Sequence, residues 1–130
     1  MAISPTQRTL KYLKDLNLNP WIVERFIKMP AMPGNGRRVD LYNCIDLIAI
    51  EEGKRVIGVQ STGQDFRGHY LKITTETPSE AKLWLSVPCT ELWLIGWRKL
   101  KVKRGGKAMR WEPRIHKFTK EDFSPSSPSP

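Results

Sequence analysis

Side chains that bind soft metals or form disulfides are scarce in this sequence. Its 130 residues include two cysteines and two histidines. Cys44 and Cys89 stand outside any CxxC or Cys/His spacing, which argues against a structural zinc site and indicates reduced core thiols in a cytoplasmic protein. His69 and His116 also lack metal-ligand spacing, and we assign neither a role.

Long apolar runs and acidic residues are scarce as well. No stretch approaches the roughly 20 apolar residues that span a bilayer, and residues 1–14 lack the apolar core of a signal peptide. Lysine and arginine together number 22 against 13 acidic residues, which gives a net charge of +9. This excess favours a polyanionic partner, either nucleic acid or an acidic membrane surface.

The length and the hydrophobic content of the chain suit one folded domain with a single core. Hydrophobic residues make up 39% of the chain. We expect the domain to cover residues 1–123 and the Ser/Pro-rich residues 124–130 to be a disordered tail. Four tryptophans are expected in the core rather than as platforms for stacked bases: Trp84, Trp93, Trp97 and Trp111.

The apolar patterns predict an α/β or α+β fold. Ser4-Pro5 followed by leucines at helical spacing predicts a helix over 5–16. Thr77-Pro78 with Glu80 predicts another helix that begins with a capping box. A short helix is expected at 65–74, and strands are expected at 21–27, 44–50, 55–62 and 91–97.

Two further features of the sheet follow from the sequence. The strand at 44–50 is apolar on both faces, so it should lie centrally with helices on each side. Residues 99–104 and 108–115 should pair as a terminal hairpin, closed by a primed turn at Gly105-Gly106.

Polar groups stand at the ends of the two central strands. The short turn after residue 50 makes this pair antiparallel, which should bring Asp46 beside Gln60 and Thr62. Gly58 is expected to leave an open space on the same face. An acid, an amide oxygen and a main-chain carbonyl around a gap can bind a hard cation such as Mg²⁺.

The same residues resemble a known family. The motifs WIVERFI, RRVDLYNCIDLIAI, VQST, FRGHYLKI and ELWLIGWRK resemble the PD-(D/E)XK nuclease superfamily over residues 10–118. The similarity is to its small members related to archaeal Holliday-junction resolvases, which include phage and prokaryotic proteins. It implies a restriction-endonuclease-like αβββαβ core, with a central mixed sheet flanked by helices, and a cytoplasmic homodimer.

The resemblance also implies roles for individual residues. Glu24 matches the first acid and Asp46 the central metal-binding acid, while Gln60 stands where Glu or Asp is usual. The metal, Mg²⁺ or Mn²⁺, would be bound by Asp46, Gln60 and the Ser61 carbonyl. Thr62 stands at the position of the catalytic lysine. Some members place this lysine on the next helix, and Lys72, or Arg67 in its place, matches that arrangement.

Each of these residues also has a structural alternative. Asp46 could bond to turn amides, and Gln60 and Thr62 could bond to each other at the sheet end. Glu24 could pair with Arg25, Arg37 or Arg38 at the surface. Asp40 could support the metal ligands, although an ion pair with Arg38 is the expectation, and Lys72 could be a solvated helix residue. These possibilities follow from the residue types alone.

The positive charge is concentrated near the end of the chain. Residues 98–117 contain nine basic residues and one acid, Glu112. Basic and apolar residues alternate along these strands, which predicts a hairpin with one basic face and one apolar face. The basic face could follow a phosphate backbone. The alternative is an edge hairpin whose lysines prevent aggregation. The residues expected to contact nucleic acid are Arg67, Lys99, Lys101, Lys103, Arg104, Lys107, Arg110 and Arg114.

Together these features predict a metal-dependent endonuclease that acts on DNA phosphodiesters, including branched or junction DNA. Two alternatives stay open. One is a nuclease-fold DNA-binding protein with a degenerate site, and the other is a non-enzymatic module that binds RNA or single-stranded DNA. The first alternative follows from Gln60 and Thr62, which stand where the resemblance places an acid and a lysine.

Overall fold

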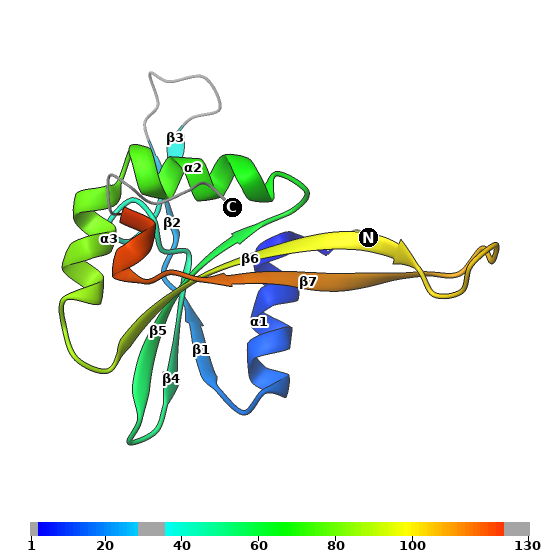
Figure 1. Cartoon of the computed structure of the whole chain (residues 1–130), viewed down its shortest axis with the longest axis horizontal. Helices are drawn as coiled ribbons and strands as arrows, with labels where there is room; N and C mark the ends of the chain where they lie inside the picture. The colour runs from blue at the N-terminus through cyan, green and yellow to red at the C-terminus, as the bar shows by residue number, and fades with distance from the viewer. Residues whose placement is uncertain (1–2, 29–35, 124–130) are drawn as a thin grey trace.

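The computed structural model describes residues 3–28 and 36–123. The predicted tail at 124–130 lies outside this part, as do residues 1–2 and 29–35. Within it the chain is α+β, with one five-stranded mixed sheet, a separate two-stranded sheet and three α-helices (Figure 1). The helices are α1 (Pro5–Asp15), α2 (Phe66–Thr75) and α3 (Pro78–Leu85).

The main sheet has the strand order β1-β4-β5-β6-β7. Its strands are β1 (Asn19–Ile22), β4 (Leu47–Glu51), β5 (Arg55–Thr62), β6 (Thr90–Lys101) and β7 (Met109–Lys117). The β5–β6 pair is parallel because α2 and α3 connect these two strands, and the other three pairs are antiparallel. β2 (Arg25–Lys28) and β3 (Gly36–Val39) form the small sheet.

Helices cover both faces of the main sheet, as the apolar strand predicted at 44–50 implies, although this strand, β4, lies second from the edge and β5 is at the centre (Figure 1). On one face, Leu13 of α1 packs on Ala49, Val59 and Ile95. On the other face, residues of α2 and α3 pack on β6 and on the segment before β4. The sheet is therefore the middle layer of a three-layer core.

The predicted helix starts are confirmed only in part. Ser4 caps α1, since its Oγ accepts a hydrogen bond from the Gln7 amide at 3.1 Å. Thr77 precedes α3 but forms no capping box. Its Oγ1 donates to the carbonyl of Ile73 and its N–H to the carbonyl of Lys72, because α2 ends directly before it.

The strand predicted at 21–27 is divided. β1 ends at Ile22 and β2 begins at Arg25, because the amides of Val23 and Glu24 both donate to the carbonyl of Asp46, at 2.9 and 3.0 Å. This break takes β2 out of the main sheet. It also fixes the backbone of Glu24 beside Asp46.

The two cysteines differ from each other. Cys44 is fully buried, and burial raises the pKa of its thiol to about 12, so it is the expected core thiol. Cys89 is exposed, and its φ of +68° places it in the turn that leads into β6. The expectation of a core position is therefore wrong for Cys89.

A buried polar chain attaches α1 to the sheet. Thr9 is fully buried, and its Oγ1 lies 2.7 Å from Ser61 Oγ and accepts a hydrogen bond from Trp97 Nε1 at 2.8 Å. Buried polar groups of this kind are costly when they lose their partners. These hydrogen bonds therefore fix α1 over the end of β5 and the middle of β6.

We expect Thr9→Val to lower the free energy of unfolding by about 2 kcal/mol, because it leaves the Trp97 N–H and the Ser61 hydroxyl without this partner. Urea unfolding monitored by circular dichroism measures the change. Thr9→Ser keeps the hydroxyl and is the matched control, which should lose less stability. Equal stability of Thr9→Val and wild type would contradict this role for Thr9.

Candidate functional site

Three acidic side chains meet where β4 and β5 adjoin the break between β1 and β2. Glu24, Asp40 and Asp46 each offer a carboxylate oxygen, and these atoms all lie within 4.8 Å of one another. Glu24 follows β1, Asp40 follows β3 and Asp46 precedes β4. Segments that are separate in sequence thus supply the three acids.

A tight turn brings Asp40 opposite Asp46. Leu41 and Ile45 form an antiparallel bridge, and Tyr42 and Asn43 between them have φ values of +52° and +61°. Two successive left-handed residues reverse the chain within a few positions. Asp40 was expected to pair with Arg38 rather than to join the metal ligands, and the Arg38 side chain lies outside the described part of the chain.

Asp46 occupies the most enclosed position of the three. It is 2% exposed, and its Oδ2 accepts hydrogen bonds from Gln60 Nε2 and from the Ser61 amide, both at 2.9 Å. The antiparallel β4–β5 pairing thus places Asp46 beside Gln60, as expected. Gln60 bonds to Asp46, and its Oε1 receives no hydrogen bond from Thr62.

Two buried acceptor atoms at this position have no partner. Among the described residues, neither Asp46 Oδ1 nor Gln60 Oε1 has a hydrogen-bond donor within reach. Gln60 is 4% exposed, so bulk water does not solvate its amide well. Unpaired buried acceptors are rare and cost free energy, which points to a donor or a cation that completes the site.

The surroundings of Asp46 favour its protonated form when no cation is present. Burial, the largest cause, raises the pKa of Asp46 to about 8. A side-chain hydrogen bond with Asp40, which forms when one of the two carboxyls is protonated, raises this pKa further, as do the negative charges of Asp40 and Glu24, whereas the hydrogen bond from the Ser61 amide lowers it. A positive charge at this position would relieve both the desolvation and the repulsion among the acids.

The acids line an open cleft of about 330 Å³. The first turn of α1 forms one wall and α2 contributes another. Besides the three acids, the lining residues are Ser4, Pro5, Thr6, Gln60, Ser61, His69 and Lys72. Carboxylates, an amide oxygen and a basic side chain thus surround a space large enough for a cation and part of a substrate.

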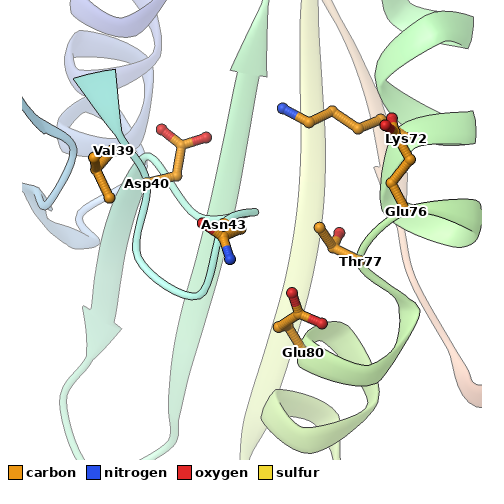
Figure 2. Close-up of a pocket in the computed structure, with 7 residues that line it drawn as sticks. All are labelled: Val39, Asp40, Asn43, Lys72, Glu76, Thr77 and Glu80. Carbon is orange, nitrogen blue, oxygen red and sulfur yellow. The ribbon is translucent and has the colours of Figure 1, made fainter. Parts of the chain in front are cut away.

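Lys72 connects this cleft to a second hollow. Asp40 and Lys72 line both spaces, and the second is also lined by Asn43, Glu76 and Glu80 (Figure 2). Figure 2 shows the Lys72 side chain extending from α2 across the hollow toward the side on which Asp40 lies. The helix lysine is therefore near the acids, which the sequence pattern alone could not establish.

Other expected members of the site lie elsewhere. Thr62 is buried but is not among the described residues that line the cleft, and Arg67 is exposed on α2. His69, whose sequence context predicts no role, lines the cleft, with its Nδ1 2.8 Å from the carbonyl oxygen of Asp65.

The expected open space at Gly58 does not exist. A side chain there would meet Ile45 Cδ1 at 2.7 Å and Trp84 Cε2 at 3.1 Å. Gly58 therefore permits close packing beneath α3. The hollow near the ends of these strands is instead the cleft that the three acids line.

The basic hairpin is a longer version of the one predicted. β6 runs without a break through Lys101, so the expected strands 91–97 and 99–104 largely form one strand. The turn carries a hydrogen bond from the Gly106 amide to the Lys103 carbonyl and has a positive φ of +78° at Gly105. This hydrogen bond makes Arg104 and Gly105 the central residues, one position before the predicted Gly105-Gly106, and since only Gly105 of the two has a positive φ the turn is not a primed one.

The strand register divides the basic residues between both faces of the hairpin. Lys99 pairs with Trp111 and Lys101 with Met109, so these lysines share a face with apolar residues of β7. Arg110 and Arg114 lie on the other face, opposite Leu100 and Gly96. The expected separation into one basic face and one apolar face is therefore wrong.

The chain was compared with protein-family models, curated protein sequences and solved structures, and none of them matches. Within the described residues, no helix is both long enough and apolar enough to cross a bilayer. Any functional assignment therefore depends on the geometry of the cleft and on the charge of the hairpin.

Proposed function

We propose that this protein is a metal-dependent endonuclease that hydrolyses DNA phosphodiesters in the cytoplasm. The observation that carries the proposal is the acid cleft, where two unpaired buried oxygens adjoin three clustered carboxylates. Mg²⁺ and Mn²⁺ prefer such oxygen donors. The basic hairpin supports a polyanionic substrate, because residues 98–117 carry nine basic residues against one acid.

The donor set suits a divalent cation of this class. Asp46 would bind it through Oδ1, with Glu24, Asp40 and the oxygen of Gln60 as further candidate ligands. The Ser61 carbonyl, which the resemblance adds, belongs to a residue that lines the cleft. A bound cation supplies Lewis-acid stabilisation and an activated water in such sites.

The remaining residues of the cleft have roles that follow from their chemistry. The Ser61 amide and Gln60 Nε2 hold Asp46 Oδ2, so the carboxylate presents its other oxygen in one orientation. Lys72 carries a positive charge in the same cleft and can stabilise negative charge on a phosphate. Thr62 carries no positive charge that could stabilise a phosphate.

One observation favours a second candidate function, a nuclease-fold DNA-binding protein that does not cut. Thr62 stands where the resemblance places a catalytic lysine, and Gln60 offers a neutral amide where a carboxylate is usual. Both changes remove charge from the site. In this alternative the hairpin binds DNA and the cleft is inactive.

A cleavage assay separates the two candidates. Duplex, branched and single-stranded DNA are incubated with the protein in Mg²⁺ or Mn²⁺, with EDTA as the metal-free control. The endonuclease proposal expects products that require the metal. Binding without cleavage of any substrate in either metal would favour the second candidate.

The hairpin lysines give a prediction about binding alone. Changing Lys99, Lys101 and Lys103 to Gln should weaken binding to unrelated DNA sequences about equally, because lysines that contact phosphates read no bases. The slope of log affinity against log salt should fall by about 0.9 for each lysine that binds a phosphate in the wild type. Fluorescence anisotropy at several salt concentrations measures both effects.

The matched control removes the same charge elsewhere. Lys14, Lys54 and Lys82 are exposed and lie outside the hairpin, so changing these three to Gln should reduce the slope less. If the two triple variants had the same slope, the hairpin would not be the surface that binds DNA. Its lysines would then serve only to protect an edge.

A further inference from the structure

We propose that Trp111 is a stacking platform for an unpaired base, so that the protein prefers nucleic acid with a single-stranded segment beside a duplex. This inference rests on the nucleic-acid binding of the proposed function. It concerns a tryptophan that was expected in the core. The structure leaves Trp111 40% exposed.

The position of α1 explains this exposure. Trp97 of β6 is 5% exposed beneath α1, where Tyr12 packs edge-on with ring centroids 5.7 Å apart. The next pair on the same face of the hairpin is Lys99 and Trp111. Figure 1 shows the β6–β7 hairpin continuing well past α1, and the contact that α1 makes with Trp111 comes from the side chain of Arg8, which leaves the ring partly exposed.

Basic groups surround the Trp111 ring. The guanidinium of Arg8 lies 4.3 Å from the ring centroid and Lys99 Nζ lies 6.0 Å from it. Arg8 comes from α1, so it links the helix to the hairpin and fixes the orientation of the ring. Lys101 lies on the same face, one strand pair further out.

The nearest acid in sequence does not counter this charge. Glu112 lies on the opposite face of β7 from Trp111 and forms an ion pair with Arg110. The face with Trp111 therefore combines an exposed aromatic ring with the positive charges of Arg8, Lys99 and Lys101. This combination binds single-stranded nucleic acid, because the cations attract phosphates while the ring stacks on a base.

A duplex cannot stack a base on Trp111, since its bases are already stacked on each other. An unpaired strand can bind the cations through its phosphates and stack a base on the ring. α1 contributes to both surfaces, because Arg8 contacts the Trp111 ring and Ser4, about one helical turn earlier, lines the acid cleft.

The test compares a duplex that has a single-stranded tail with the same duplex made blunt. Wild-type protein should bind the tailed DNA more tightly. Trp111→Ala should weaken binding to the tailed DNA about tenfold, which corresponds to ~1.4 kcal/mol of stacking, and should change binding to the blunt DNA less than twofold. Trp111→Phe keeps an aromatic ring and should retain most of the preference.

Trp21 is the matched control. It is 75% exposed on β1, the strand at the opposite edge of the sheet, so Trp21→Ala should leave both affinities unchanged. An equal effect of Trp111→Ala on the two DNAs, or no effect on either, would overturn the inference while leaving nucleic-acid binding intact. If the wild type bound neither DNA, the proposed function and this inference would both fail.

Discussion

Replacing Asp46 with Asn is expected to reduce DNA cleavage more than ~100-fold, since changing groups that only orient a metal ligand already costs about 10- to 100-fold. Asn has nearly the same shape, and its oxygen can accept the hydrogen bonds from Gln60 and the Ser61 amide. The fold should therefore survive. Single-turnover cleavage in Mg²⁺ measures the effect.

Asp15→Asn is the control for this experiment. Asp15 is exposed on α1 and pairs only with Lys11 at 3.1 Å among the ion pairs that the structure describes. Its substitution removes the same formal charge far from the acid cluster, and it should leave the cleavage rate unchanged. Wild-type activity in Asp46→Asn would show that the cleft is not the active site.

The stability of the metal-free protein is expected to fall as the pH rises from about 4 to about 8. The pKa of Asp46 is about 8 in the folded chain against an ordinary value of 3.8, so folding favours the protonated carboxyl. The stability that the protonated Asp46 contributes is fully present below pH 3.8, and it is lost as the pH rises through the folded-state pKa of about 8. The loss should be on the order of a few kcal/mol.

Asp46→Asn removes this titration and isolates it from all other groups. Urea unfolding with EDTA gives the free energy of unfolding of wild type and variant at pH 5 and pH 8.5. The variant should gain stability relative to the wild type at the higher pH. A difference that stays constant across this range would mean that Asp46 keeps an ordinary pKa.

The central layer of the fold could be predicted because its signals are local. Runs of apolar residues, and their alternation with polar ones, identify β4 and β5. Ser4 followed by Pro5 marks the start of α1. The approach of Asp46 to Gln60 follows from the antiparallel pairing alone. These predictions required no knowledge of contacts between distant segments.

The features that could not be predicted depend on such distant contacts. The strand at 21–27 breaks because the Asp46 carbonyl accepts two amides of a segment more than twenty residues earlier. Asp40 joins the acids through a turn that contains Tyr42, a residue type that rarely signals a positive φ. Gly58 looked like a gap because the sequence does not reveal that Ile45 and Trp84 fill it.

The hairpin illustrates the same limit. The alternation of side chains predicts which residues of one strand share a face, but only the register between β6 and β7 shows that Lys99 lies opposite Trp111. The position of α1 then decides which residues are covered. Trp97 is buried and Trp111 is exposed, although the two look alike in sequence.

The measurement that tests the central claim most directly is a calorimetric titration of Mn²⁺ into wild type, Asp46→Asn and Asp15→Asn. The acid cleft predicts saturable binding to the wild type and to Asp15→Asn, and its loss in Asp46→Asn, because Asp46 supplies the unpaired buried oxygen at the centre of the three acids. Binding that is absent from the wild type, or that is equal in all three proteins, would contradict a metal site in this cleft.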